Sequence, residues 1–184
     1  SVISYQKDGV LSTQIEGGAQ GYQATPRLVE YVVTLTQNLA ERINALVPSD
    51  FHLSGTQQTN KLAVCLGGGS KYDKHIDNLG WSDGIGDMRK MTALLYLQPS
   101  GSHSDDADHG ETDPRGGYFR AYDVPEIGKM KVFAPRGDRL LLFWSDSLVH
   151  DVSPSFAPNS EIDRRWALTV WFVVKNGGKI RKTD

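Results

Sequence analysis

The sequence predicts a mainly β domain, a sandwich or barrel of short strands backed by one helix. Three observations lead to this prediction. Residues 26–46 carry apolar side chains at helical spacing, the chain after Phe51 breaks into short aliphatic and aromatic runs, and Gly, Pro, Asp and Asn residues bound those runs. Short strands at irregular spacing after one long helix indicate sheets with a helix packed on them.

The N-terminal part of the chain contains the predicted helix. Residues 1–24 are polar and glycine-rich, so we expect a flexible end with one short strand near Val10–Ile15. Thr25 is placed to cap the helix, Pro26 suits its first turn, and Pro48 stops it. Its apolar positions step by three and four residues and form one stripe that we expect to pack on a sheet: Leu28, Val32, Leu35, Leu39, Ile43 and Leu46.

The rest of the chain predicts short strands separated by turns and two longer polar stretches. Asn78–Arg89 and Ser100–Arg115 are interpreted as surface loops. The second contains several His and Asp residues, but no apolar frame orients them, which favours a solvated loop. Residues 175–184 are expected to form a flexible end. The predicted strands are Lys61–Leu66, Met91–Gln98, Gly117–Ala121, Lys131–Phe133, Arg139–Trp144 and Arg165–Val174.

Length and composition fit one domain over residues 1–184, with 39% hydrophobic and 23% charged residues. The formal charge of −2 gives no electrostatic reason to expect nucleic acid or an anionic membrane as partner. Apolar runs fall short of the ~20 residues that span a bilayer, and the first residues show no signal-peptide pattern. We expect a monomer without such partners. The start at Ser1 indicates a processed or truncated chain.

The chain has a single cysteine, Cys65, in the run KLAVCL. A lone cysteine forms no internal disulfide, so the cytoplasm or the nucleus is the expected location. Because the residues around it are apolar, we interpret Cys65 as a small buried side chain.

Three residues form a candidate metal site. His75 and Asp77 make an H-x-D pair in KYDKHIDN, and His150 follows LLLFWSD. Two imidazoles and one carboxylate hold ferrous iron on one face and leave positions open for a co-substrate and O₂. In a strand, residues i and i+2 point to one side, so the pair can share one metal. If the strand Arg139–Trp144 lies opposite this segment, the metal lies between two sheets. A chance surface pair is the alternative.

Arg165 adds a second feature. Strand alternation in RWALTVWF places Arg165, Ala167, Thr169 and Trp171 on one face. An arginine on a nearly apolar strand is costly to bury without an anion, and its guanidinium binds a carboxylate through two parallel hydrogen bonds. A dicarboxylate ligand would meet that need. The alternative is an arginine at the strand end that reaches water or pairs with Asp or Glu.

In this order, His75, Asp77, His150 and Arg165 with Thr169 resemble the signature of Fe(II)- and 2-oxoglutarate-dependent dioxygenases. Longer strings resemble the prolyl 4-hydroxylases that act on hypoxia-inducible factor, and relatives that act on the Skp-type adaptor of ubiquitin ligases or on elongation factor Tu. The resemblance covers residues 60–174 and is carried by KHIDN, TALLYLQ, GGYFRAY, RLLLFWSD, HDVSP and RWALTVWF.

The resemblance implies a double-stranded β-helix, a jelly-roll, cupin-like fold of two sheets. The implied iron ligands are His75, Asp77 and His150. The implied reaction is hydroxylation of proline at C4 in a protein substrate, coupled to decarboxylation of 2-oxoglutarate to succinate. Fe(II) is the cofactor, 2-oxoglutarate and O₂ are co-substrates, ascorbate restores Fe(II), and oxygen sensing is a role to be tested.

The co-substrate site follows from the same resemblance. Arg165, with help from Tyr96, would pair with the distal carboxylate of 2-oxoglutarate, and Thr169 would complete the pocket. One position departs from the pattern of the animal enzymes. Cys65 stands where they have a tyrosine that reaches the co-substrate, so this site has one phenol fewer, and a cysteine near iron and O₂ can be oxidised.

For the substrate proline, the resemblance implies contacts with Tyr72, Arg89 and Trp171, and Asn78–Arg89 is a candidate lid over a bound peptide. The expected partner is a proline-containing segment of a ubiquitin-ligase adaptor, a protein like hypoxia-inducible factor, or an elongation factor. Three alternatives stay open: an oxygenase of the same superfamily with another substrate, a non-catalytic peptide-binding module, and a structural zinc site, for which a closed shell with more Cys and His would be expected.

Overall fold

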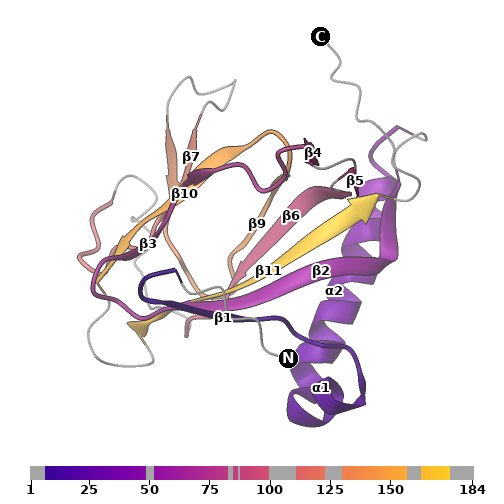
Figure 1. The fold of residues 1–184 in the computed structure, drawn as a ribbon, viewed down its shortest axis with the longest axis horizontal. Helices are drawn as coiled ribbons and strands as arrows, with labels where there is room; N and C mark the ends of the chain where they lie inside the picture. The colour runs from indigo at the N-terminus through magenta and orange to yellow at the C-terminus, as the bar shows by residue number, and fades with distance from the viewer. Residues whose placement is uncertain are drawn as a thin grey trace.

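A computed structural model describes residues 7–48, 52–82, 85–86, 88–99, 111–122, 130–156 and 163–174. Two antiparallel sheets and one long helix make up the fold, as the sequence predicts (Figure 1). The larger sheet has the strand order β1-β2-β11-β6-β9 and the smaller sheet β3-β10-β7-β8. The larger sheet consists of β1 (Val10–Thr13), β2 (Leu53–Cys65), β11 (Arg165–Val174), β6 (Arg89–Tyr96) and β9 (Leu140–Trp144).

The smaller sheet lies across from the larger one, and a short hairpin follows its first strand (Figure 1). Side chains from both sheets form one core cluster between them, which includes Leu94, Phe119 and Ala167. The smaller sheet consists of β3 (Ser70–His75), β10 (Val149–Ser155), β7 (Phe119–Tyr122) and β8 (Lys131–Phe133), and the hairpin of β4 (Trp81–Ser82) and β5 (Ile85–Gly86).

The helices cover the other face of the larger sheet. α1 (Ala19–Ala24) leads into α2 (Pro26–Asn44), which lies beside β2 and β11 (Figure 1). Val32 and Ala40 of α2 pack with Leu168, Val170 and Phe172 of β11 in the largest core cluster. This confirms the predicted amphipathic helix on a sheet. Neither described helix has the length and apolar composition that crossing a bilayer requires.

Thr25 is the N-cap residue of α2, as predicted, but its side chain makes no capping hydrogen bond. Thr25 also ends α1, and its backbone N–H and its hydroxyl both donate to the carbonyl of Gly21. One detail of the predicted helix is wrong. Leu46 does not belong to the buried stripe, because α2 ends at Asn44 and Leu46 is 86% exposed. Pro26 does occupy the first turn.

The predicted strands differ from the observed ones mainly at their ends. β2 begins at Leu53, well before the predicted Lys61, because its polar first half still pairs with β11, with Gln58 opposite Phe172. β7 begins two residues after Gly117, since Gly116 and Gly117 adopt positive φ angles of 64° and 74° that interrupt the strand. The predicted strand near Val10 pairs with β2 as β1, whereas residues 1–6, 100–110 and 175–184 lie outside the described part.

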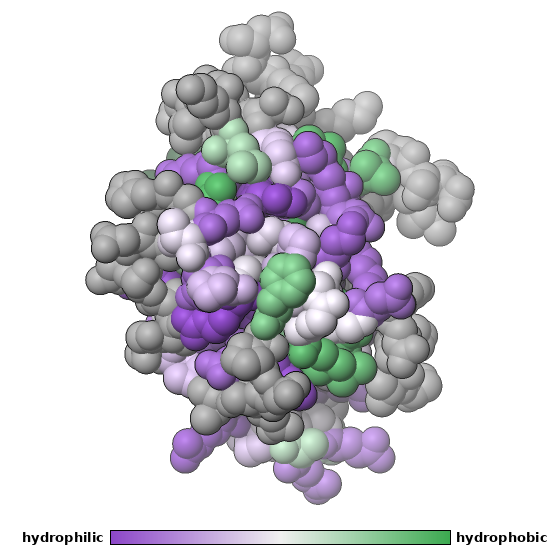
Figure 2. All heavy atoms as spheres, turned by 90° about the vertical axis from the view of Figure 1, so that its left-hand side faces the viewer, coloured by the Kyte–Doolittle hydropathy of each residue, from purple (hydrophilic) through white to green (hydrophobic). Residues whose placement is uncertain are grey.

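Figure 2 shows the face of the molecule that lies on the left-hand side of Figure 1. Among the described residues on this face, hydrophilic ones predominate. Hydrophobic residues occur there as small separate groups rather than as a continuous band (Figure 2). Such scattered apolar groups are ordinary for a water-exposed protein surface.

Candidate metal and co-substrate site

The two histidines come from neighbouring strands of the smaller sheet. His75 is the last residue of β3, His150 is the second residue of β10, and the two are direct Cα partners across the ladder. Their ring centroids lie 4.3 Å apart. The predicted strand Arg139–Trp144 is β9 of the larger sheet, which lies across from the sheet that contains β3. His150 does not come from that opposite sheet, because the chain turns after β9 to form β10, the strand that pairs with β3.

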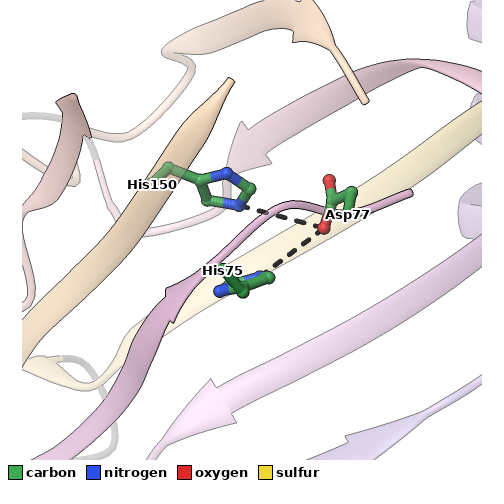
Figure 3. Close-up of side chains that lie close together, drawn as sticks. All are labelled: His75, Asp77 and His150. Atoms are coloured by element: carbon green, nitrogen blue, oxygen red, sulfur yellow. Dashed lines mark ion pairs between the residues drawn. The ribbon is translucent and has the colours of Figure 1, made fainter. Parts of the chain in front are cut away.

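Asp77 completes the set. It lies two residues after His75, beyond the end of β3, so the alternation of side chains along a strand does not apply to it. Its Oδ1 lies 3.6 Å from Nε2 of His75 and 3.8 Å from Nε2 of His150. Figure 3 shows the three side chains pointing toward one another. One ligand atom from each residue lies within 4.8 Å of the others, which is a spacing that one metal ion can bridge.

Backbone contacts set the tautomer of both imidazoles. Nδ1 of His75 lies 2.7 Å from the carbonyl oxygen of Asp73, and Nδ1 of His150 lies 3.0 Å from that of Leu148. A carbonyl oxygen only accepts hydrogen bonds, so Nδ1 carries the proton in each ring. Nε2 of each neutral ring then presents a lone pair toward Asp77. Three acceptor atoms that face one another repel unless a cation lies among them.

The carboxyl group of Asp77 is held in its charged form. Burial raises its pKa, but the contacts with His75, Thr92 and His150 outweigh burial and bring the pKa well below its usual range. Oγ1 of Thr92 donates to Oδ2 at 2.6 Å. Oδ1, which faces the histidines, is therefore left for a metal.

Aromatic packing fixes the ring of His150. Phe119 stacks on it with ring centroids 5.0 Å apart, and Phe143 meets it edge-on at 4.9 Å. This apolar surrounding lowers the pKa of His150, because burial disfavours the charged ring. The neutral form with a free lone pair on Nε2 is the form that binds metals.

Arg165 lies at the start of β11 and is only 4% exposed. Its Nε donates to the carbonyl of Gly117 at 3.0 Å, and its Nη2 donates to the hydroxyl of Tyr96 at 3.3 Å. Among the described residues, no carboxylate lies within ion-pair distance of this guanidinium. A buried cation without an anion is costly, so the site is complementary to a carboxylate that comes from a ligand.

One cavity joins the metal-ligand set to Arg165. Its volume is about 450 Å³ when its open mouth is included. Strand alternation places Arg165, Ala167, Thr169 and Trp171 on its wall, as the sequence predicts. Most of the candidate residues meet here: the cavity is lined by His75, Asp77, His150, Arg165, Thr169, Tyr72 and Trp171.

Three candidate residues lie around this cavity rather than on its wall. Tyr96 is fully buried beneath Arg165 and hydrogen-bonds to it. The guanidinium of Arg89 lies 5.4 Å from the ring centroid of Trp171. Cys65 is the Cα partner of Arg165 across β2 and β11, and its sulfur lies 4.0 Å from Nη1.

The sequence did not predict four residues that contribute to this site. Thr92 and Ser145 form a hydroxyl pair behind Asp77, Gly117 accepts from Arg165, and Lys61 lines the cavity. Of these four, only Lys61 could have been found from the local sequence pattern. A lysine in the alternating run NKLAVC falls on the same face as Ala63 and Cys65, so it points inward if they do.

Comparisons with known proteins agree with this geometry. Residues 60–173 match the model of the 2OG-Fe(II) oxygenase superfamily. The chain is 28% identical over 162 residues to the hypoxia-inducible factor prolyl hydroxylase of Caenorhabditis elegans, covering 88% of this chain and 18% of that protein. It is 29% identical over 164 residues to Egl nine homolog 1 of Rattus norvegicus, covering 87% and 40%.

A solved structure shares the fold. It is a prolyl hydroxylase from Trichoplax adhaerens in complex with a hypoxia-inducible factor oxygen degradation domain peptide fragment. The TM-score is 0.66 at 29% identity, and the match covers 92% of this chain and 64% of that chain. This chain spans less than two thirds of the length of each of these proteins.

The matched segment runs from β2 to β11 and contains the two histidines, the aspartate and Arg165. It covers more than half of the chain, and the jelly-roll of two antiparallel sheets is the fold that the resemblance implied. The chain therefore belongs to the 2OG-Fe(II) oxygenase superfamily.

Proposed function

We propose that this chain is an Fe(II)- and 2-oxoglutarate-dependent dioxygenase that hydroxylates C4 of a proline in a protein substrate. One observation carries the proposal: a single cavity contains both a converging His–Asp–His set and a buried arginine without a carboxylate partner in the described part of the chain. A 2-oxo diacid has a keto-acid end for a metal and a second carboxylate for Arg165. The named relatives support proline as the target.

The residues present fit the metal that the family uses. His75 and His150 offer neutral nitrogens and Asp77 offers one charged oxygen, so the set leaves a divalent ion with net positive charge for an anionic co-substrate. Fe(II), when bound, supplies the redox chemistry that couples O₂ and 2-oxoglutarate to hydroxylation. The protein orients the partners and excludes water from the cavity.

The substrate proline is assigned to the aromatic part of the cavity wall. Tyr72 and Trp171 both line the cavity, and flat rings pack well against a pyrrolidine ring. Burial raises the pKa of Tyr72 to about 12, so its phenol stays protonated and can donate a hydrogen bond. The segment Asn78–Arg89, which includes the β4–β5 hairpin, is proposed as the lid.

The partner is proposed to be an intracellular protein with a proline-containing segment. Candidates are a transcription factor like hypoxia-inducible factor, a ubiquitin-ligase adaptor and an elongation factor. Cys65 is a free buried thiol, which agrees with a location in the cytoplasm or the nucleus.

The first experiment tests the metal and co-substrate site without a substrate. Fe(II) and 2-oxoglutarate are added to the protein under anaerobic conditions, and the visible spectrum is recorded. We expect a weak charge-transfer band that requires both additions. Its absence from a protein with an intact circular dichroism spectrum would contradict the proposal.

Matched variants make this test specific. Asp77→Ala removes a proposed ligand and should abolish both the band and the turnover of 2-oxoglutarate. Asp73→Ala is the control, because Asp73 is exposed and contributes only its backbone carbonyl to His75, which the substitution retains. Proline-containing peptides from the three candidate partners are then screened for a mass increase of one oxygen, which identifies the substrate class.

A further inference from the structure

A second cavity adjoins the one that contains the metal-ligand set. It lies among β1, β2 and β3, and its wall includes Lys7, Ser12, Lys61, Tyr72 and Trp171. Lys61, Tyr72 and Trp171 line both cavities, so these three side chains form the boundary between them. A ligand that reaches the metal-ligand set past Tyr72 and Trp171 therefore passes beside this second cavity.

The second cavity is positively charged. Nζ of Lys7 lies 4.7 Å and Nζ of Lys61 lies 5.0 Å from the ring centroid of Tyr72, and Lys61 is also 5.5 Å from that of Trp171. Aromatic faces attract ammonium groups but do not neutralise them. The described wall of this cavity contains no Asp or Glu, and neither lysine has a carboxylate within ion-pair distance in the described part of the chain.

Lys61 is partly buried, and no carboxylate of the described residues lies within ion-pair distance of it. Burial lowers its pKa, while the charge of Asp77 acts in the opposite direction. A lysine that is removed from water in this way has lost hydration that a ligand carboxylate would replace. Lys7 is exposed, so it meets the same ligand from the solvent side.

Lys61 lies some distance along the strands from the carboxylate site at Arg165. On the paired strands, Lys61 lies opposite Thr169, and Cys65 lies opposite Arg165. Four residues of strand separate the two positions, which corresponds to about 13 Å between Cα atoms. A carboxylate paired with Arg165 therefore lies at a different point along the strand pair from Lys61, which lies on the wall that the two cavities share.

We propose that Lys61 and Lys7, with Tyr72 between them, form a subsite for an acidic side chain of the protein substrate. This proposal rests on the proposed function and adds a substrate preference to it: the target proline lies near a Glu or Asp in its own chain. Lys61 discriminates by charge, and Tyr72 is shared between the acidic side chain and the proline.

The test uses pairs of synthetic peptides that contain a central proline and carry either Glu or Gln at one neighbouring position, varied from peptide to peptide. Binding is measured by fluorescence anisotropy of labelled peptides without O₂, so the readout does not require turnover. We expect the best Glu peptide to bind about five- to tenfold more tightly than its Gln partner at low salt. Lys61→Met should remove this difference and Lys61→Arg should retain it, while Lys7→Ala should reduce it.

Lys131→Ala is the matched control, because Lys131 lies on β8 and lines neither cavity. Equal binding of all Glu and Gln pairs by the unmodified protein would overturn the proposal. So would a Lys61→Met variant that weakens 2-oxoglutarate binding and leaves the Glu preference intact, since Lys61 would then belong to the co-substrate site. Failure of the proposed function would give a different result. The protein would then not turn over 2-oxoglutarate and would add no oxygen to any peptide, whether or not it binds Glu peptides more tightly than Gln peptides.

Discussion

Thr92 and Asp77 are joined by a hydrogen bond of 2.6 Å from Oγ1 of the threonine to Oδ2 of the aspartate. Thr92 lies on β6 of the larger sheet, whereas Asp77 follows β3 of the smaller sheet. This bond ties the loop after β3 to the opposite sheet and orients Oδ1 toward the histidines. Because the proton of Thr92 goes to Asp77, Ser145 is the donor in its 2.8 Å contact with Oγ1 of Thr92.

Thr92→Val should weaken metal binding. Valine has nearly the same shape but cannot donate to Asp77, so the carboxylate loses the contact that orients it. We expect the dissociation constant for Fe(II) or Mn(II) to rise about 10- to 100-fold, as is usual when such outer hydrogen bonds are lost. Isothermal titration with Mn(II) measures it. Ser145→Ala should have a smaller effect, and equal effects of the two variants would contradict this assignment.

Gly117→Ala should disturb the carboxylate site selectively. Gly117 has a φ of 74°, a Cβ at this position would lie 3.1 Å from Cδ of Arg165, and the glycine carbonyl accepts from Nε of the same arginine. Added bulk therefore moves the guanidinium. We expect the dissociation constant for 2-oxoglutarate to rise roughly tenfold, and stability to fall by about 1 kcal/mol from the strained φ.

The control for this prediction is Gly68→Ala. Gly68 also has a positive φ, 65°, but no atom lies within 4 Å of its hypothetical Cβ. It should therefore show a similar loss of thermal stability with unchanged 2-oxoglutarate binding. If both variants weaken binding equally, backbone strain rather than contact with Arg165 is responsible.

Arg165→Lys should retain the charge and still impair binding of the co-substrate. Lysine cannot donate to Gly117, Tyr96 and a carboxylate at once, because it lacks the planar fork. We expect 2-oxoglutarate to bind on the order of 30-fold more weakly, which corresponds to ~2 kcal/mol. The charge-transfer band titrated with 2-oxoglutarate reports it. Arg42→Lys on α2 should bind normally, and normal binding by Arg165→Lys would exclude a role for the fork.

The face of β11 could be predicted from sequence because it depends on a local rule. Strand alternation alone places Arg165, Thr169 and Trp171 on one side, and all three line the cavity. The buried stripe of α2 follows from a similar rule of spacing, and both predictions are confirmed except at the helix end.

The pairing of the two histidines could not be predicted in this way. β10 reads VHDVSPS, and its Asp, Ser and Pro residues disfavour a strand locally. The structure compensates through distant partners: Asp151 accepts from Arg120 at 2.6 Å and from the hydroxyl of Tyr122 at 2.8 Å. The roles of Thr92 and Ser145 likewise depend on how closely the two sheets approach, which no local pattern encodes.

Cys65 should remain unmodified during aerobic turnover. The sequence raised the hypothesis that this cysteine is oxidised near iron and O₂, but its side chain is 0% exposed and is not on the cavity wall. Oxidation requires access to the thiol, and burial behind Arg165 denies it. Mass spectrometry of the tryptic peptide after turnover should therefore show no added oxygen. Iodoacetamide should label Cys65 only in denaturant; rapid labelling of the folded protein would show that this part of β2 opens.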